Sequence, residues 1–574
     1  MEIKPQQEVA LAGKKEGIWH KYSIQEYIEQ TNLISAGLLK LGVKKGDTIA
    51  MISSNRPEYN IVDMATMQIG AILVPIYPTI SESDYRYILN NAEITYIFLE
   101  GEELLRKIEK IIPELPSFKG IYTFINRGRF NYFEQLLNLG KENLDLTKIN
   151  AIKKEITTND VACIIYTSGT TGNPKGVMLS HNNLTMQLKM LEGTPQKWSD
   201  TAFSFLPLCH AYEKMMVYLY QYLGMSVYYA ENLGTISENI KEVNPTMMTC
   251  VPRILEKIYD KIYNGGRKLP FFQQKLYYWA LGLAIRYKIE DRSICYNIQH
   301  KIAEKLVFSK WRAAIGGHFD IVVSGGAAIQ PRIASFFSAI GMPVFEGYGI
   351  TETSPVIAVS SRKKHGRCVG TVGFPLEGVE VKIVPETDEI ICRGHNVMLG
   401  YYKDPELTAQ VIDKEGWFHT GDSGKFTEQG QLVITGRLKN IFKTSFGKFV
   451  NSFLIEEKIL QSPFIENIMV VGENQKFAAA IIIPDFTFLK LWCRKHKIRY
   501  TTDEEVIKNE TVKARFKKEI AKYNAFFGDT EQIKKFELLA DEWSQQTGIL
   551  TPTLKVKRNV ALDRYKNVIE KIFS

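Results

Sequence analysis

A short stretch rich in glycine, serine and threonine most constrains this chain. It reads Y-T-S-G-T-T-G-N-P-K-G-V-M-L-S-H over residues 166–181 and follows an apolar run at 161–166 that predicts a buried strand. Its glycines let the backbone turn tightly and approach a ligand, and successive N–H groups in such a loop form a concave anion site. Hydroxyl donors and the ammonium of Lys175 add to that site. The stretch therefore predicts a polyphosphate-binding loop.

The residues expected to contact phosphate are small, carry a hydroxyl or carry the cation: Thr167, Ser168, Gly169, Thr170, Thr171, Gly172 and Lys175. The spacing differs from the G-x-x-x-x-G-K-[ST] loop of P-loop NTPases, because the two glycines lie too close together and Gly176 follows the lysine. A flexible surface loop is the alternative. It does not account for lysine, hydroxyl groups and glycine gathering directly after a strand.

Strand-like and helix-like segments alternate along most of the chain. Residues 23–26 form a capping box before an amphipathic helix that ends near Gly42. Apolar runs that predict strands lie at 48–52, 71–76, 94–99, 203–208, 226–229, 247–251, 320–323 and 343–345. This alternation is typical of α/β folds in which helices cover parallel sheets. We interpret the polar segment 119–157 as connecting structure.

Two more glycine-rich turns follow predicted strands. S-G-G-A-A spans 324–328, and G-Y-G-I-T-E-T spans 347–353. Open α/β sheets bind ligands at the carboxyl ends of their parallel strands. We therefore expect these two turns and the first loop to build a ligand site.

The character of the sequence changes after about residue 368. Short strands between Gly and Pro turns predict a small β subdomain, and a further block of strands and helices follows, including a helix expected at 530–536. We expect residues 1–437 to form a large N-terminal domain of two doubly wound α/β subdomains plus a small β-barrel. Residues 438–574 are expected to form a small, mobile α+β domain.

Charge and cysteine content limit the class of function. The net charge of +9 suits polyanionic substrates and anionic membrane surfaces, and no compact Lys/Arg block of the kind that binds nucleic acid occurs. The seven cysteines are scattered without a C-x-x-C pair, which favours reduced thiols in a cytoplasmic protein. No uncharged apolar run approaches ~20 residues, so we expect any contact with the inner face of the membrane to be peripheral.

Seven motifs occur in an order that resembles one known family. They are the loop at 166–181, L-P-L-C-H-A-Y-E-K at 206–214, the turns at 324–328 and 347–353, G-W-F-H-T-G-D at 416–422, G-R-L-K-N at 436–440 and L-T-P-T-L-K-V-K-R at 550–558. Together they look like the long-chain acyl-CoA synthetases of the adenylate-forming superfamily. The resemblance implies that ATP activates a carboxylate as an acyl adenylate with release of pyrophosphate. The CoA thiol then displaces AMP.

The resemblance assigns roles around the phosphates. Residues 167–175 would hold the β- and γ-phosphates, Thr351 would contact the α-phosphate, and Glu352 with Thr167 would bind Mg²⁺. Lys555 would bridge the carboxylate and α-phosphate oxygens during adenylation. A solvated tail lysine is the alternative for Lys555, because other cations follow it in the sequence.

The resemblance also places the nucleoside and the carboxylate. Tyr348 would stack on adenine, Asp422 would accept hydrogen bonds from both ribose hydroxyls, and Arg437 would support the ribose. The backbone around the adenine would come from small residues of the two turns: Gly325, Gly326, Ala327 and Gly349. His210 would face the substrate carboxylate and help to gate the acyl tunnel, whereas a single histidine after a strand is more often a satisfied core residue.

Two further lysines belong to a domain rotation that the resemblance implies. Lys439 would be the hinge about which the C-terminal domain turns between the two half-reactions. That rotation would withdraw the adenylation lysine and present Lys443 and nearby backbone to CoA.

We therefore expect a ligase that uses ATP and Mg²⁺ to join a medium- to long-chain fatty acid to CoA. Two alternatives stay open: a fatty acyl-AMP ligase that loads an acyl carrier protein, and a non-catalytic nucleotide- or lipid-binding protein on the same fold. Acyl-AMP ligases carry an insertion after the small β subdomain, and none is evident between Asp422 and Arg437. The apolar helix expected at 212–223 either lines an acyl pocket or is plain core. No motif encodes acyl chain length or oligomeric state.

Overall fold

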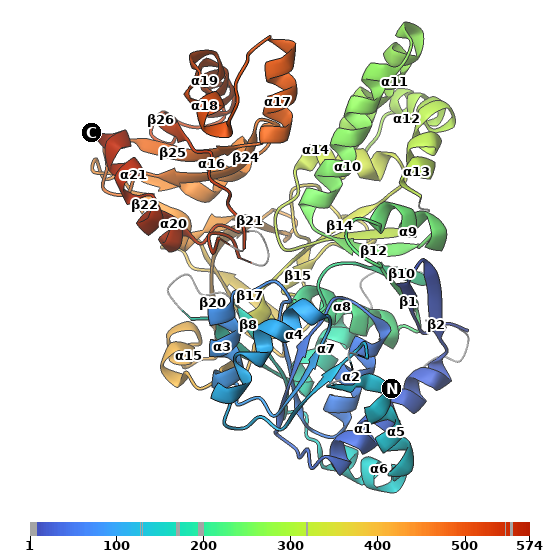
Figure 1. Cartoon of the computed structure of the whole chain (residues 1–574). Coiled ribbons are helices and arrows are strands. Elements are labelled where there is room, and N and C mark those ends of the chain that lie inside the picture. Colours follow the sequence, from blue (N-terminus) through green and yellow to red (C-terminus); the bar gives the residue numbers. More distant parts are fainter. Residues whose placement is uncertain are drawn as a thin grey trace.

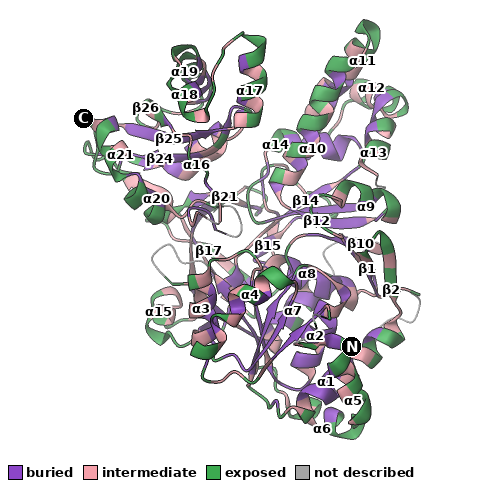
Figure 2. Ribbon diagram, in the orientation of Figure 1, coloured by how far each residue is buried: buried purple, intermediate pink, exposed green. Residues whose placement is uncertain are grey.

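The computed structural model describes residues 8–126, 128, 130–167, 173–192, 200–316, 319–545, 547–551 and 555–574. Figure 1 shows a large body, a helical arm that projects from it, and a C-terminal part beside the arm. Figure 2 shows that buried residues gather on the strands and on the helix faces that cover them.

Eight strands form the first large sheet: β3 (Thr48–Ile52), β4 (Ile72–Pro75), β5 (Tyr96–Leu99), β6 (Gly120–Thr123), β7 (Asn131–Tyr132), β8 (Val161–Thr167), β9 (Lys175–Ser180) and β19 (Gly400–Tyr401). Their order is β19-β9-β8-β4-β3-β5-β6-β7. The three apolar runs before residue 100 form parallel strands, as predicted. The segment 119–157 is more than connecting structure, because it supplies β6 to the sheet.

Nine strands form the second large sheet: β1 (Leu11–Lys15), β2 (Ile18–Tyr22), β10 (Thr201–Ser204), β11 (Ser226–Tyr229), β12 (Met247–Cys250), β13 (Ile321–Ser324), β14 (Val344–Tyr348), β15 (Ala358–Val359) and β16 (Phe374–Pro375). Their order is β16-β15-β14-β13-β12-β10-β11-β1-β2, and β10 to β14 run parallel. The strand predicted at 203–208 ends earlier, because the Asn55 side chain hydrogen-bonds the backbone of Leu206 and Leu208.

Helices cover both sheets: α1 (Ile24–Lys40), α2 (Pro57–Gln68), α3 (Glu82–Asn91), α4 (Glu102–Glu109), α5 (Phe133–Glu142), α6 (Leu146–Glu155), α7 (His181–Glu192), α8 (Ala211–Tyr222), α9 (Ile236–Val243), α14 (Pro331–Ala339) and α15 (Pro405–Val411). One continuous core joins the two sheets through α7 and α8; it includes Met51 of β3, Met216 of α8 and Val227 of β11. The doubly wound α/β architecture is therefore confirmed.

The first helix shows how local sequence sets its own ends. The Ser23 hydroxyl accepts the N–H of Glu26, and the Glu26 carboxylate accepts the N–H of Ser23 at 2.7 Å, so the predicted capping box is present. Gly42 follows the helix with a φ of +81°, which favours glycine. Ile28, which the periodicity places on the apolar face, is 47% exposed and lies at the edge of that face.

A helical arm rises from the second sheet. It consists of α10 (Pro252–Gly265), α11 (Phe271–Ile285), α12 (Ile294–Ala303), the π-helical segment η3 (Glu304–Phe308) and α13 (Ser309–Ile315). Its base packs on the sheet in a core that includes Phe203, Leu255 and Phe308. Among the described residues, no helix is both long enough and apolar enough to span a bilayer.

The small β subdomain is a four-stranded antiparallel sheet of β17 (Val379–Ile383), β18 (Glu389–Gly394), β20 (Phe418–Phe426) and β21 (Leu432–Arg437). A short turn, η5 (Leu438–Asn440), leads from it to the C-terminal strands: β22 (Ile441–Lys443), β23 (Phe449–Asn451), β24 (Ile465–Val471), β25 (Ala478–Pro484) and β26 (Ile533–Leu538). The helices there are α16 (Ser452–Ile459), α17 (Phe486–Lys495), α18 (Asp503–Lys508), α19 (Glu510–Asn524), α20 (Arg558–Arg564) and α21 (Lys566–Phe573).

The helix predicted at 530–536 is wrong, because this segment contains most of β26. The strand pairs in parallel with β25, whose seven residues are all buried, and so covers an edge that would otherwise be open. The Asn524 side chain also hydrogen-bonds both the N–H and the carbonyl of Ile533. Tertiary pairing thus outweighs the local sequence pattern here.

Candidate active site

The glycine-rich loop joins two antiparallel strands rather than a strand and a helix. Thr167 ends β8, Lys175 begins β9, and the two residues pair across the hairpin. The predicted phosphate-binding residues between them lie outside the described residues: Ser168, Gly169, Thr170, Thr171 and Gly172. The hairpin therefore sets a hydroxyl beside an ammonium at the base of the loop, a geometry that differs from the P-loop.

Glu352 lies close to this hairpin. Its Oε1 atom accepts a hydrogen bond from the Tyr401 hydroxyl at 2.9 Å, and the Lys175 Nζ atom lies 5.5 Å from the centre of the Tyr401 ring. Burial lowers the pKa of Lys175, the Lys439 ammonium lowers it further, and the Glu352 carboxylate opposes both effects. An anionic ligand would relieve the repulsion between the two lysines, so this corner of the cleft favours phosphate.

A single carboxylate here suits a magnesium ion that is shared with a nucleotide. Magnesium prefers oxygen ligands and is usually held by one or two carboxylates together with substrate phosphates. Glu352 lies in a tight turn, η4 (Thr351–Thr353), directly after the buried Thr351. No group of three or more His, Cys, Asp or Glu side chains that could hold a metal occurs within the described part of the chain. The residues present fit a shared ion rather than a closed protein site.

The two other glycine-rich turns lie side by side, because β13 and β14 are parallel neighbours. The turn after β13 supplies the predicted residues Gly325, Gly326 and Ala327. A Cβ atom on Gly325 would lie 3.0 Å from the Tyr212 ring, and one on Gly349 would lie only 1.7 Å from the Pro355 carbonyl oxygen. Protein atoms thus pack directly against both glycines, so each turn requires glycine there, and both turns lie at the carboxyl edge of the sheet, where open α/β sheets bind ligands.

Asp422 connects two of the predicted nucleoside residues. Its Oδ2 atom accepts the Tyr348 hydroxyl at 2.9 Å, and its Oδ1 atom accepts the Arg437 Nε–H at 3.0 Å. Asp422 is buried, and it pairs with Arg437 across the β20–β21 hairpin. Burial and the neighbouring carboxylate raise the pKa of Tyr348 well above its ordinary value. Each carboxylate oxygen keeps a further lone pair for a ligand hydroxyl.

Lys555 reaches the same cleft from the C-terminal part. It is exposed to solvent, yet crowding by the surrounding protein and repulsion by the Arg437 guanidinium lower the pKa of its ammonium to about 8. The carboxylates of Asp422 and Glu457 partly oppose this effect. The structure thus brings the lysine of the C-terminal motif near Asp422 and Arg437, which lie 133 and 118 residues earlier in the sequence.

His210 lies at the start of α8, near enough to Lys555 for the lysine charge to act on it. It caps α8, and its Nδ1 atom accepts the Tyr212 backbone N–H at 3.1 Å, so a neutral ring carries its proton on Nε2. Burial and the nearby Lys555 charge lower the pKa of His210 to about 4. The ring is therefore neutral at pH 7 and can donate one hydrogen bond to an oxygen in the cleft.

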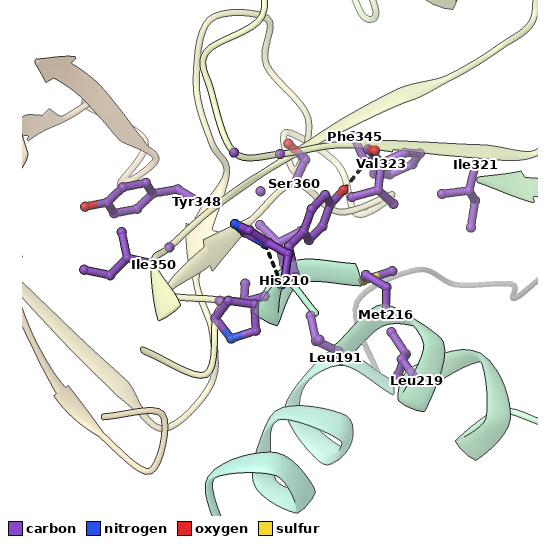
Figure 3. A pocket seen from close by; sticks show the side chains of 18 of the residues that line it. Leu191, His210, Met216, Leu219, Ile321, Val323, Phe345, Tyr348, Ile350 and Ser360 are labelled. Carbon is purple, nitrogen blue, oxygen red and sulfur yellow. Dashed lines mark hydrogen bonds between the residues drawn. The ribbon is translucent and has the colours of Figure 1, made fainter. Parts of the chain in front are cut away.

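An apolar pocket opens beside His210 (Figure 3). Its volume is about 770 Å³, part of which is open to solvent. Tyr348 and Ile350 lie at one end, toward the nucleoside residues, and Leu191, Met216 and Leu219 lie toward the other. The remaining wall comes from β12, β13, β14 and the segment 355–360. The pocket lining is therefore mostly apolar, from Tyr348 and Ile350 to the side chains of α8.

Residues of the apolar helix at 212–223 form part of the pocket wall and part of the core, on adjoining faces of α8; that the pocket holds an acyl chain stays a prediction. All four of Met215, Met216, Tyr218 and Leu219 are buried in the core, and Met216 and Leu219 also line the pocket. The Tyr218 hydroxyl donates to Asp63 of α2 at 2.7 Å, which fixes that face of α8 against α2. The helix therefore serves as pocket wall and core at once.

The contacts of Lys443 lie outside the cleft. Its Nζ atom lies 5.5 Å from the centre of the Phe449 ring, and its carbonyl accepts the Asn474 N–H, so these contacts stay within the C-terminal part. Two residues that sequence reasoning missed are Tyr401, which holds Glu352, and Glu457, whose charge acts on Lys555. Neither lies in a motif, and only folding brings each to its partner.

Solved structures share this fold. The anthranilate CoA ligase AuaEII in complex with anthranoyl-AMP superposes with a TM-score of 0.70 at 17% identity, covering 99% of this chain and 95% of that one. The o-succinylbenzoate CoA synthetase MenE of Bacillus subtilis, in complex with its acyl-adenylate intermediate, has a TM-score of 0.68 at 18% identity, covering 96% of this chain and 95% of that one. The fold is that of adenylate-forming enzymes.

Sequence comparison gives the family. The AMP-binding enzyme model matches residues 3–402, and the model of the AMP-binding enzyme C-terminal domain matches residues 440–574. The chain belongs to the AMP-binding enzyme family. Long-chain-fatty-acid–CoA ligase FadD15 of Mycobacterium bovis is 30% identical over 97% of this chain and 93% of its own length. Long-chain-fatty-acid–CoA ligase 6 of Rattus norvegicus is 30% identical over 98% and 84%.

Proposed function

We propose that this chain is a long-chain fatty acid–CoA ligase that forms AMP. ATP and the fatty acid carboxylate give an acyl adenylate and pyrophosphate, and the CoA thiol then attacks the acyl carbon and releases AMP. The observation that carries the proposal is that Lys555 lies near enough to Asp422 and His210 for their charges to act on one another, while His210 lines an apolar pocket. Relatives named long-chain-fatty-acid–CoA ligases, similar over nearly the whole chain, support the same reaction.

Three parts of the cleft would hold the nucleotide. Thr167, Lys175 and the loop between them would neutralise the β- and γ-phosphates, and Thr351 would contact the α-phosphate. Glu352 and Thr167 would hold Mg²⁺, which when bound supplies positive charge at the phosphate oxygens.

The nucleoside would lie between the two glycine-rich turns. Tyr348 would stack on adenine, and the backbone at Gly325, Gly326, Ala327 and Gly349 would lie against its other side. Asp422 would accept the ribose hydroxyls with the lone pairs that remain to it, and Arg437 would hold the carboxylate in place.

Lys555 would stabilise the charge that moves during adenylation. The carboxylate oxygen attacks the α-phosphorus, so negative charge gathers between carboxylate and phosphate in the transition state. An ammonium already positioned there needs no reorganisation when the charge develops. His210, neutral with its proton on Nε2, would orient the carboxylate by a hydrogen bond at the entrance to the pocket.

We propose two domains, 1–437 and 438–574, with Lys439 as the hinge between them. Adenylation and thioester formation need different groups at one reacting carbon, and rotation of the smaller domain would exchange them. Lys443, whose contacts now lie within the C-terminal part, would then face CoA. The present arrangement, with Lys555 in the cleft, is consistent with the adenylation state.

The nearest alternative is a fatty acyl-AMP ligase that passes its acyl group to a carrier protein. In this chain, β20 and β21 are joined by a tight turn in which the Gly430 N–H donates to the Thr427 carbonyl, so no insertion separates Asp422 from Arg437. This favours free rotation and CoA as the acceptor. We further propose a cytoplasmic protein that contacts the inner face of the membrane peripherally and binds no nucleic acid.

The test is a reaction with ATP, Mg²⁺, palmitate and CoA, in which pyrophosphate, acyl-AMP and acyl-CoA are each measured. A fatty acid–CoA ligase yields palmitoyl-CoA and AMP in equal amounts. Accumulation of palmitoyl-AMP without palmitoyl-CoA would identify an acyl-AMP ligase. No release of pyrophosphate would exclude both enzymes and favour a binding protein.

A further inference from the structure

The helical arm holds nearly all of the excess positive charge of the protein. Between Lys261 and Arg312 there are eleven Lys or Arg residues and three Asp or Glu residues, whereas the net charge of the whole chain is +9. Among the described residues, Arg312 is the one cation of this segment with an ion pair, to Glu304. The arm is therefore a concentrated source of positive potential.

The same arm exposes large apolar side chains. At its tip, where α11 begins, Phe271 is 62% and Phe272 is 83% exposed. Along α12 and η3, four aliphatic residues recur at a spacing of four: Ile294, Ile298, Ile302 and Leu306, with exposures of 81%, 56%, 47% and 42%. Residues four apart lie on one face of a helix, so these four form an apolar stripe. Figure 2 shows the upper part of the arm largely exposed.

Cations lie directly beside these apolar groups. The Lys275 Nζ atom lies 4.5 Å from the centre of the Phe271 ring at the tip, and Arg267 and Lys268 are exposed in the turn before α11. Along the stripe, Lys301 and Lys305 each precede one of its members and are exposed. Aromatic and aliphatic groups flanked by Lys and Arg match the boundary between phospholipid head groups and acyl chains.

We propose that the part of this arm between residues 261 and 312 docks the protein on the surface of an anionic phospholipid bilayer. Its aromatic tip and apolar stripe would enter the head-group layer while its cations contact lipid phosphates. The proposal rests on the proposed function, since a long-chain fatty acid partitions into bilayers and a docked ligase would take it from there. A second copy of the chain is a poorer occupant, because a symmetric interface would set two strongly positive arms against each other.

The test is co-sedimentation of the full-length protein with vesicles. One set contains phosphatidylcholine and phosphatidylglycerol in equal amounts, and the other contains phosphatidylcholine alone. We expect binding to the anionic set that falls with added salt. The double variant Lys301→Glu/Lys305→Glu should bind at least about 25-fold more weakly, since each cation near the surface contributes about fivefold. The double variant Phe271→Ser/Phe272→Ser should lose at least about tenfold.

Matched variants in the C-terminal part are the controls. Lys517→Glu/Lys518→Glu makes the same charge change on exposed residues of α19, and Leu491→Ser/Phe526→Ser removes apolar groups that are 60% and 65% exposed. Both should bind vesicles like the unaltered protein. Equal losses in the arm and control variants, or none in the arm variants, would overturn the proposal. So would conversion of a dimer to a monomer by the arm variants without loss of vesicle binding.

Ligase activity in detergent solution separates this proposal from the proposed function. All four variants should convert palmitate, ATP and CoA like the unaltered protein, because none of their residues lies in the cleft. An unaltered protein that binds anionic vesicles but makes no acyl-CoA would count against the ligase and leave the docking surface standing. An active ligase that ignores both vesicle sets would overturn the docking surface alone.

Discussion

Replacement of Lys555 by alanine isolates the contribution of the C-terminal part to adenylation. The Lys555 side chain is exposed, and its backbone is held independently, since its N–H donates to the Thr551 hydroxyl and its carbonyl accepts the Thr551 N–H. Removing the side chain should therefore change the free energy of unfolding by less than about 0.5 kcal/mol. Any large effect on rate would then reflect the ammonium itself.

The size of the effect follows from the position of that ammonium. It lies where its charge acts on Asp422, Arg437 and His210, in a crowded cleft that lowers its pKa to about 8. One positioned charge that stabilises a developing anion is worth about 2.7–4 kcal/mol, or about 10²–10³ in rate. Lys555→Ala should slow acyl-adenylate formation by that factor and largely spare thioester formation from supplied acyl adenylate.

Single-turnover experiments measure the two steps separately. Pyrophosphate release follows adenylation, and thioester formation is followed from synthetic palmitoyl-AMP and CoA. Lys557→Ala, two residues away, is the matched control and should slow either step less than about twofold. If Lys555→Ala slowed both steps equally, the idea that this lysine serves one half-reaction and then withdraws would be wrong.

Four further outcomes follow from the same geometry. First, kcat/KM for adenylation should fall as the pH rises through about 8, because Lys555 then loses the proton that makes it a cation; a pH–rate profile flat to pH 10 would contradict this. Second, Asp422→Ala should raise the KM for ATP about 10- to 100-fold, the scale of one or two charged hydrogen bonds, with little change in the KM for palmitate in initial-rate assays. Third, Met216→Trp should fill the pocket and lower kcat/KM for palmitate at least about tenfold relative to octanoate; a uniform fall across an acyl-length panel would mean that the pocket does not hold the chain. Fourth, Gly349→Ala should lower the melting temperature and abolish adenylation, because its Cβ would lie 1.7 Å from the Pro355 carbonyl oxygen; full activity would show that the turn can move.

Much of the fold was readable from local sequence. The strand at 48–52 occurs with the predicted bounds, because it is a largely apolar run that the sheet buries on both faces. The segment at 530–536 was predicted as a helix, and the strand at 203–208 was predicted too long. In both cases a partner distant in sequence decides the outcome, β25 in the first and Asn55 in the second.

The candidate site, too, could be predicted from the sequence only in part. The motifs were sufficient to nominate Asp422, Lys555 and Glu352, because unusual residue combinations at turns carry that information. The motifs could not show that Tyr401 holds Glu352, because the Tyr401 hydroxyl reaches the Glu352 carboxylate only when β19 pairs with β9. The sequence of the glycine-rich loop likewise does not show that the loop joins two antiparallel strands, because its chemistry is compatible with either a helix or a strand after it.

Exchange of labelled pyrophosphate into ATP tests the central claim most directly, because it reports reversible adenylation in the cleft without any thiol acceptor. The unaltered protein with Mg²⁺ should catalyse exchange that depends on added palmitate and that Lys555→Ala slows by about 10²–10³. Exchange without a fatty acid, or none with any fatty acid, would contradict the view that Lys555 and the N-terminal cleft together activate a carboxylate.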